Sequence, residues 1–161
     1  MRVGRQDGII TLKNSKIILD PDFNGNGRIR TDEIEITGGS DLAEYFTRDD
    51  LTESLEPGTV VSVTGENGEI KASEGARDRK AIGIVSGANG IRTGMSLGQK
   101  GSIANGDALV AITGRVYVRV SEENGIVEPG DFLTSATEKG KVMRVEDFDK
   151  CRGAILGKAL T

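Results

Sequence analysis

The chain has 161 residues, a length that fits one domain, or a compact domain with a short leader, and that can bury a core without disulfides. Its net charge of −4 is spread over residues of both signs, and it has no tryptophan and few other aromatic residues. This composition argues against a dedicated nucleic-acid surface. Twenty-three glycines against three prolines indicate many tight turns, and therefore many short strands.

Several kinds of site are excluded by residue types that are scarce in the chain. There is no histidine, which excludes Ser-His-Asp and Cys-His catalysis and any imidazole metal site. The single cysteine, Cys151, cannot form a disulfide within the chain, and we interpret it as a small packing residue. No run has the length and apolarity of a signal peptide or a membrane span. A protein that acts outside the cell would then leave by lysis, by a dedicated secretion route or within a larger parent chain.

The first 38 residues are predicted to form a β leader. Residues 8–19 contain two β-branched runs around a polar turn, which is typical of a β-arch or hairpin. Residues 33–37 alternate charged and apolar side chains, which predicts a half-buried strand. Between these strands, the segment DFNGNGRIRTDE, from Asp22 to Glu33, has the twelve-residue spacing of a calcium-binding loop.

Oxygen ligands at alternate positions of this loop can meet at one cation only if the chain turns sharply. Gly27 permits that turn because glycine reaches positive φ at little cost. Only two of the expected ligands carry a negative charge, and Arg30 occupies the ninth position, where a small oxygen ligand or a water is usual. The predicted Ca²⁺ ligands are the side chains of Asp22, Asn24, Asn26 and Glu33 and the backbone carbonyl of Arg28.

A second interpretation of the same segment needs no metal. Asn-Gly is the strongest short signal for a hairpin, so the loop also reads as a plain turn between two strands. Because strands rather than helices are expected on both sides, neither interpretation makes a helix–loop–helix calcium sensor. We expect the segment to have a structural role, fixing the path of the chain, rather than a role in calcium sensing.

Residues 39–161 are predicted to form a mainly β body, folded as a roll or barrel. One short helix is expected near residues 40–46, because Ser40 is a good N-cap and Ala43 and Glu44 favour helix. Apolar and β-branched runs between glycine turns predict the strands. These are expected at residues 59–64, 69–72, 80–86, 108–121 (interrupted by Gly114), 132–134, 141–145 and 154–160.

The body contains an internal repeat, at about residues 55–86 and 127–160. Each copy reads as a Pro-Gly turn, a strand, a glycine turn, a second strand, a connector and a buried strand. Any small β fold reuses such turns, but the order of the matches favours two similar units that pack together. At an offset of 72 positions, and after a later insertion, the matches are Glu56-Pro57-Gly58 with Glu128-Pro129-Gly130, Gly68 with Gly140, Ile70 with Val142, and Ile82-Gly83 with Leu156-Gly157.

The case for catalysis rests on one pair of carboxylates. In a helical turn at residues 40–46, Asp41 and Glu44 would lie on one face and could share a proton for acid–base chemistry. Acidic residues near a helix start are explained as well by the helix dipole. The glycine-rich segment 86–94 matches neither nucleotide-binding fingerprint. We predict neither a catalytic nor a cofactor site, and Asp41 and Glu44 are the only catalytic candidates.

Six segments of the body occur together in an order typical of one family. They are ITGGSDLAEYF (36–46), LEPGTVVSV (55–63), RDRKAIGIVSGANGIRTGMSLGQ (77–99), ITGRVYVRV (112–120), VEPGDFLTSA (127–136) and GAILGKAL (153–160). With the loop before them, they make residues 20–161 resemble a C-terminal β module of large bacterial surface proteins and phage tail-fibre or appendage proteins. That module is similar to intramolecular-chaperone autoprocessing domains of the peptidase G2 kind. A looser, architectural resemblance is to the small β-roll decoration proteins of phage capsids.

The resemblance implies a non-catalytic structural module that forms a homotrimer and stabilises a fibre or appendage. Its partners would be copies of itself and the larger fibre or particle, in a virion or at a cell surface, with neither nucleic acid nor membrane. Two alternatives follow from the same resemblance. One is a capsid or particle decoration protein. The other is a self-cleaving chaperone domain, whose chemistry the resemblance implies around Asp41 and Glu44.

Overall fold

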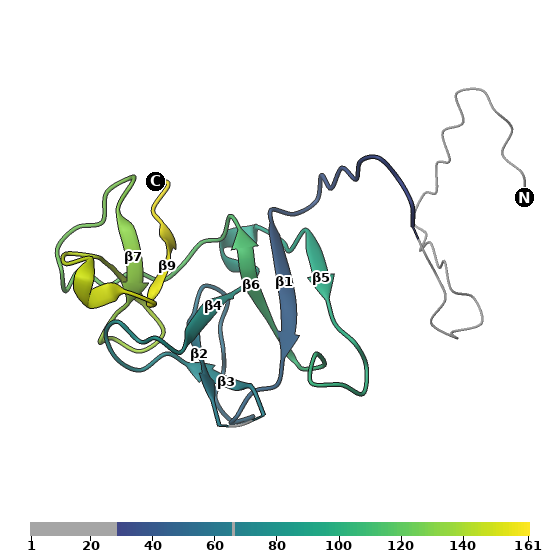
Figure 1. Cartoon of the computed structure of the whole chain (residues 1–161), viewed down its shortest axis with the longest axis horizontal. Coiled ribbons are helices and arrows are strands. Elements are labelled where there is room, and N and C mark those ends of the chain that lie inside the picture. The colour runs from purple at the N-terminus through teal and green to yellow at the C-terminus, as the bar shows by residue number, and fades with distance from the viewer. Residues whose placement is uncertain (1–28, 66) are drawn as a thin grey trace, which may run out of the picture. The chain divides into compact units, whose positions relative to one another are not determined.

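A computed structural model describes residues 29–65 and 67–161, and it divides the chain into two units, Met1–Glu35 and Ile36–Thr161. From here on, the name body is used for this second unit, residues 36–161, which contains all the strands of the described residues (Figure 1). Its helical structure there is limited to two 3-10 turns, η1 (Ala88–Gly90) and η2 (Asp149–Cys151). The prediction of a mainly β fold is confirmed. Within the described residues the strands form two open sheets, and no closed barrel.

The larger sheet has six strands in the order β3-β2-β4-β6-β1-β5. Neighbouring strands run antiparallel, except that the short edge strand β5 runs parallel to β1. Because β6 lies between β4 and β1, the sheet joins segments that are far apart in the sequence. The strands are β1 (Asp41–Phe46), β2 (Val60–Thr64), β3 (Glu69–Ala72), β4 (Ala81–Val85), β5 (Met95–Leu97) and β6 (Ala108–Gly114).

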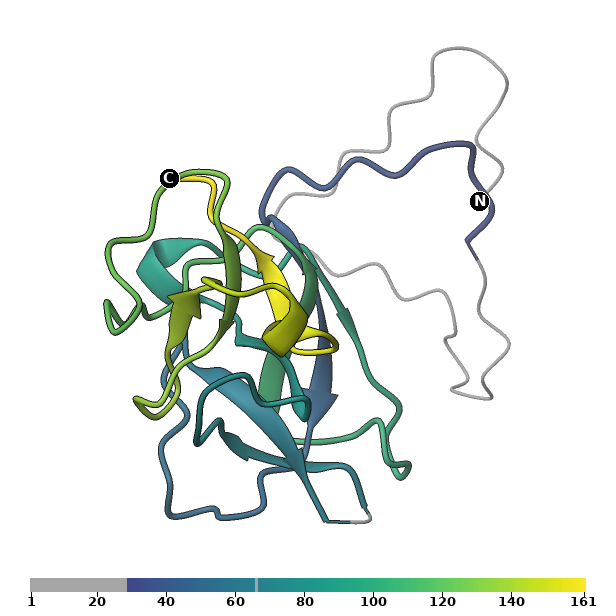
Figure 2. The same ribbon diagram turned by 60° about the vertical axis from the view of Figure 1, so that its left-hand side comes forward.

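The smaller sheet has three antiparallel strands in the order β8-β7-β9, namely β8 (Val142–Arg144), β7 (Phe132–Ser135) and β9 (Ile155–Lys158). It lies beside the larger sheet (Figure 2), and β9 contacts β4. Val60 and Ile84 of the larger sheet pack in one apolar cluster with Leu133 and Val142 of the smaller sheet. The two sheets are therefore held together by apolar packing.

The smaller sheet reproduces half of the larger one, because β7, β8 and β9 take the places of β2, β3 and β4. Val61 pairs with Ala72, and 72 positions later Leu133 pairs with Arg144. The register also shifts at the same place, directly after Val61 in β2 and directly after Leu133 in β7. The two segments matched in the sequence thus share topology, register and a strand irregularity.

The structural repeat begins further upstream than the sequence comparison indicates. A parallel bridge joins Arg48 to Ile70, and another joins Val120 to Val142, again 72 positions later. The offset grows to 74 at the last strand, where Gly83 lies opposite Val61 and Gly157 opposite Leu133. We name residues 46–86 the first repeat and residues 118–160 the second repeat.

The predicted helix at residues 40–46 is wrong, since residues 41–46 form strand β1. So short a segment gains little from helix formation by itself, because helix nucleation is costly. As a strand it pairs with β6 on one side and β5 on the other, and Ala43 becomes fully buried. Tertiary pairing has overridden the local preference of Ala43 and Glu44 for helix.

Two predicted strands also differ from the structure. Residues 33–37 form no strand, and Ile34 and Ile36 are exposed by 58% and 42%, because no described strand pairs with them. The strand predicted at residues 108–121 ends at Gly114, which has a φ of 109°, and residues 115–119 belong to no strand. The strands predicted within residues 8–19 lie outside the described residues.

Candidate functional site

The predicted calcium loop lies mostly outside the part of the chain that the structure describes. Four of its five predicted ligands, Asp22, Asn24, Asn26 and Arg28, are outside it, while Glu33 is described and exposed. Among residues 29–65 and 67–161, no group of three or more cysteine, aspartate and glutamate side chains is placed to hold a metal ion. The calcium site stays a prediction, and Glu33 is its one ligand whose surroundings are defined.

The two candidate catalytic carboxylates, Asp41 and Glu44, lie on strand β1, so the shared helical face predicted for them does not exist. Asp41 is only 5% exposed, and among the described residues neither of its carboxylate oxygens has a hydrogen-bond partner. Glu44 is half-buried. A buried carboxylate without a partner is unusual, because burying a polar group costs free energy unless a hydrogen bond compensates.

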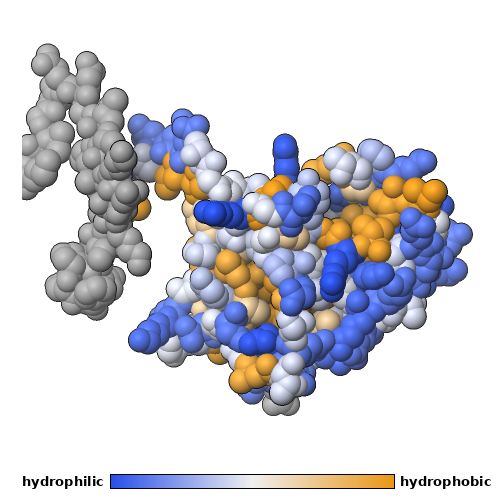
Figure 3. Space-filling view, turned by 180° about the vertical axis from the view of Figure 1, so that it is seen from behind, coloured by the Kyte–Doolittle hydropathy of each residue, from blue (hydrophilic) through white to orange (hydrophobic). Residues whose placement is uncertain are grey.

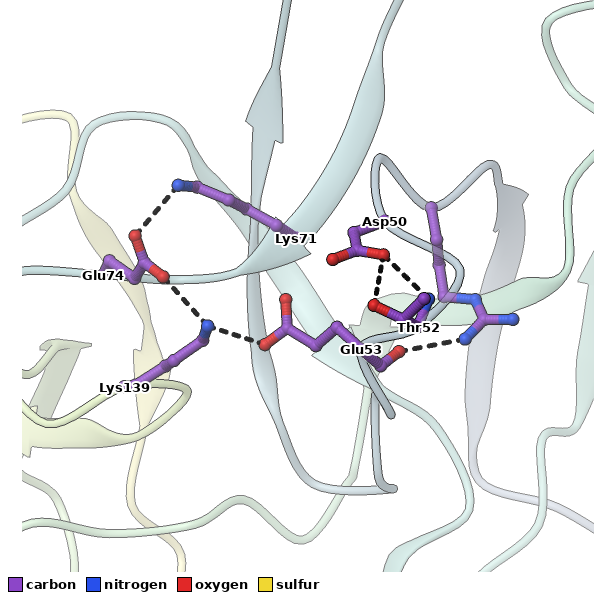
Figure 4. Close-up of polar contacts among 7 residues, drawn as sticks. Asp50, Thr52, Glu53, Lys71, Glu74 and Lys139 are labelled. Carbon is purple, nitrogen blue, oxygen red and sulfur yellow. Dashed lines mark hydrogen bonds and ion pairs between the residues drawn. The ribbon is translucent and has the colours of Figure 1, made fainter.

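A cluster of charged side chains lies at the boundary between the two repeats (Figure 4). Lys139, in the turn between β7 and β8, places its Nζ 2.8 Å from a carboxylate oxygen of Glu53 and 2.9 Å from one of Glu74. Glu74 also pairs with Lys71 at 2.9 Å. Hydrogen bonds first from Lys139 and then from Lys71 lower the pKa of Glu74 to about 2. Glu53 and then Glu74 raise the pKa of Lys139.

The loop that presents Glu53 to this cluster is fixed by short-range hydrogen bonds (Figure 4). The Asp50 carboxylate accepts bonds from the backbone N–H of Thr52 at 2.8 Å and from its hydroxyl at 2.7 Å. Arg48 donates a bond to the backbone carbonyl of Glu53 at 3.0 Å. These contacts satisfy the charges of the cluster with one another, so we interpret the cluster as a link between the repeats rather than a reactive site.

A groove with a volume of about 680 Å³ lies between residues 114–120 and residues 156–161. We name it the β9 groove. Its lining is mostly apolar and includes Val127, Leu133 and Val142 of the second repeat. Tyr117 and Leu160, on opposite walls, are exposed by 46% and 66%. The space-filling view shows hydrophobic surface gathered at the end of the body that holds the smaller sheet (Figure 3).

Neither the charged cluster nor the β9 groove was predicted from the sequence. A signal for the groove was nevertheless present. When the offset of 72 positions is carried upstream, DLAEYF at 41–46 aligns with TGRVYV at 113–118, and Tyr45 aligns with Tyr117. That alignment would have predicted a strand at 41–46, and it would have marked residues 113–118 as the equivalent segment, most of which lines one wall of the β9 groove.

No family model, no curated protein and no solved structure matches the chain. Within the described residues, no helix has the length and apolarity needed to cross a membrane. Cys151 is 1% exposed, as expected for a packing residue. The functional conclusions therefore rest on the geometry of the body and on its sequence.

Proposed function

We propose that this chain is a non-catalytic structural module that forms a homotrimer and stabilises a phage or bacterial surface fibre or appendage. The supporting observation is a set of apolar side chains exposed on three neighbouring strands at one edge of the larger sheet. Soluble proteins rarely expose neighbouring large apolar side chains unless they form an interaction site. They lie on both faces of the sheet around the β5 edge, since the register places Met95 and Leu97 of β5 on the face opposite to Tyr45 of β1. Their exposed fractions, with that of Ile112 on β6, run from 37% to 45%.

Self-association is the simplest way to cover this edge. β5 has three residues and pairs only with β1 among the described strands, so its outer backbone groups are open to another strand. A closed ring of identical chains would cover the same edge on every copy. The number three comes from the resemblance in the sequence. In such an assembly the two sheets of each body would form the predicted β-roll, with its free edges covered by neighbouring copies.

Light scattering on the full chain tests the proposal. We expect a particle of three times the 17.1 kDa mass of one chain. Leu97→Lys should give monomers with an unchanged circular dichroism spectrum, because Leu97 is already 45% exposed. Leu51→Lys, at a residue that is 70% exposed in the loop after β1, is the matched control and should leave the trimer intact. A stable monomer contradicts the proposal, and a trimer that survives Leu97→Lys removes the β5 edge from it.

One observation favours self-cleavage as a second function. The buried, unpartnered carboxylate of Asp41 is in a setting where acid–base chemistry is common. In this alternative the chain hydrolyses its own backbone near Asp41 and Glu44. Denaturing gels of the purified full chain should then show two fragments that accumulate with time, and Asp41→Asn or Glu44→Ala should abolish them. A chain that stays intact through prolonged incubation rules this function out.

A further inference from the structure

The apolar clusters of the two repeats match at six equivalent positions. In the first repeat, the cluster also contains Ala108 and Val110, which strand β6 inserts between β4 and β1. Among the described residues no counterpart of β6 stands between the matching elements of the second repeat, and the β9 groove lies there instead. The matched positions are Phe46 and Val118, Leu55 and Val127, Val61 and Leu133, Ile70 and Val142, Ile82 and Leu156, and Val85 and Ala159.

Two equivalent glycines give independent support. A Cβ on Gly83 would lie 2.5 Å from the backbone oxygen of Ala111 and 2.7 Å from a methyl carbon of Val110, so glycine is required where β6 passes. A Cβ on Gly157, the equivalent residue of β9, would meet nothing within 4 Å. Neither glycine has a positive φ. Within a single copy, the described structure gives no reason for glycine at position 157. A strand that passed β9 in the way that β6 passes β4 would supply that reason.

Both walls of the β9 groove carry backbone that is free to pair. β9 is an edge strand of the smaller sheet, and its equivalent β4 uses the corresponding edge to pair with β6. On the opposite wall, residues 115–119 belong to no strand. The backbone N–H groups of Arg115 and Arg119 donate to the carbonyls of Ser40 and Gly58, whereas no backbone hydrogen bond is formed by Val116 or Val118 among the described residues. The equivalents of Val116 and Val118 are Glu44 and Phe46 of β1, which pair with β6. The groove therefore has two facing edges that a single antiparallel strand could join.

We propose that the β9 groove receives a strand from a second copy of this chain, residues 8–14 of its leader. This proposal rests on the self-association proposed above, but not on the β5 edge or on the number three. The occupant must place a small residue and a large apolar residue where Ala108 and Val110 lie in the first repeat. It must also leave room for the backbone to pass Gly157.

The leader segment Gly8-Ile9-Ile10-Thr11-Leu12-Lys13-Asn14 has the residue pattern of β6, Ala108-Leu109-Val110-Ala111-Ile112-Thr113-Gly114. Both sequences read as small, apolar, apolar, small or threonine, apolar, polar, and glycine or asparagine. Aligned in this way, Gly8 takes the place of Ala108 and Ile10 the place of Val110. The segment lies outside the described residues, so the match is one of sequence pattern.

The leader is long enough for donation to a neighbour. Residues 15–35, which separate the segment from the body, can extend over at most about 70 Å. A compact body of this length has a radius of gyration of only about 14 Å. Strand exchange between copies through such a connector is a common route to symmetric assemblies.

Disulfide cross-linking between full-length chains tests the proposal. In the β4–β6 register, Ile84 pairs with Ala111. The equivalent of Ile84 in the second repeat is Lys158, and Thr11 takes the place of Ala111, so the proposal places Lys158 opposite Thr11. Facing residues of antiparallel strands are close enough for a disulfide. We expect a Thr11→Cys chain and a separately tagged Lys158→Cys chain, when mixed and oxidised, to form a covalent heterodimer on a non-reducing gel. Gln6→Cys in place of Thr11→Cys is the out-of-register control and should give little product.

A second variant tests the groove itself. Gly157→Val should lower the heterodimer yield by about tenfold, because its side chain would meet the donated strand. It should leave the circular dichroism spectrum of the chain without cysteine substitutions nearly unchanged, since its Cβ meets nothing in one copy.

Several results would overturn strand donation. One is that Gln6→Cys and Thr11→Cys give the same heterodimer yield, and another is that neither gives a cross-link. A third is that Gly157→Val does not reduce the heterodimer yield. In the Thr11→Cys, Lys158→Cys double variant, a disulfide found only within single chains would show that the second copy is not the donor. If the chains assemble but do not cross-link, strand donation is contradicted and the proposed self-association still stands. A monomer in light scattering would contradict the proposed function as well.

Discussion

Lys139 of the second repeat and Glu53 of the first form an ion pair 2.8 Å long. It crosses the same boundary at which Val60 and Ile84 pack against the second repeat. The two kinds of contact have different parts in the fold. Buried apolar side chains supply most of the stability of such a boundary, whereas an exposed ion pair adds little and mainly fixes the alignment of the two loops.

We predict that the charged cluster makes a small contribution to stability that depends on pH. The pKa of Glu74 is lowered from 4.5 to about 2, so the contribution is fully present above pH 4.5 and is lost as the pH falls towards 2. Lys139→Met should lower the Tm slightly at pH 6 and have no effect near pH 2. Thermal unfolding from pH 2 to pH 6 measures this difference. An effect of Lys139→Met that is the same at every pH would show that the pairing is unimportant.

The core substitution Ile70→Ala should lower the free energy of unfolding by about 2–5 kcal/mol, because Ile70 is fully buried and the change leaves a cavity. Ile70→Val, which removes one methyl group, should cost about 0.5–1.5 kcal/mol. Urea unfolding measures both values. Since the repeats share an apolar cluster, each variant should unfold in a single transition. Two separate transitions would show that the repeats fold independently.

Gly106→Ala should be among the more damaging glycine substitutions. A Cβ at this position would collide with the backbone of Phe46 and Thr47, which cannot move without breaking the end of β1. We expect a loss of at least about 1–3 kcal/mol in the free energy of unfolding. Gly38→Ala is the control, since its Cβ would meet nothing within 4 Å and the residue has no positive φ. Equal effects of the two alanines on urea unfolding would contradict the predicted collision.

The calcium loop is tested by unfolding with and without the metal. If residues 22–33 bind Ca²⁺ in the native state, millimolar Ca²⁺ should raise the Tm relative to a chelator, because a ligand that binds the folded state stabilises it. Glu33→Ala should abolish that increase, while Asp32→Ala, next to it, should retain it. No change in the Tm, or a change that survives Glu33→Ala, would leave the segment as a plain turn.

The sequence predicted most strands of the body because β-branched runs between glycine turns are a local signal. The strand predicted at 69–72 coincides with β3, and the repeat fixed the relation between β2, β3 and their later equivalents. The helix predicted at 40–46 failed because Ala43 and Glu44 favour helix locally, whereas β6, more than sixty residues away, makes the segment a strand. The edge strand β5 was not predicted, since three exposed residues carry too little pattern.

The candidate sites depended even more on contacts that local patterns do not record. The pairing of Lys139 with Glu53 joins loops from different repeats. The significance of Gly157 emerges only when its surroundings are compared with those of Gly83. Asp41 became notable because its carboxylate is buried without a partner among the described residues, a property of packing rather than of spacing.

The insertion of β6 between β4 and β1 also constrains the order in which the chain can fold. β2 and β3 are joined by a short turn and can pair as soon as both have been synthesised, whereas β1 must wait for β6, since Phe46 pairs with Ala108. β5, which is made earlier, can pair only with Leu42, Ala43 and Glu44, so Tyr45 and Phe46 have no described strand partner until β6 has been synthesised. We therefore expect the docking of β1 and β5 onto β6 to be a late step in folding, and we expect the edge they form to be the last part of the sheet to become protected from exchange with solvent.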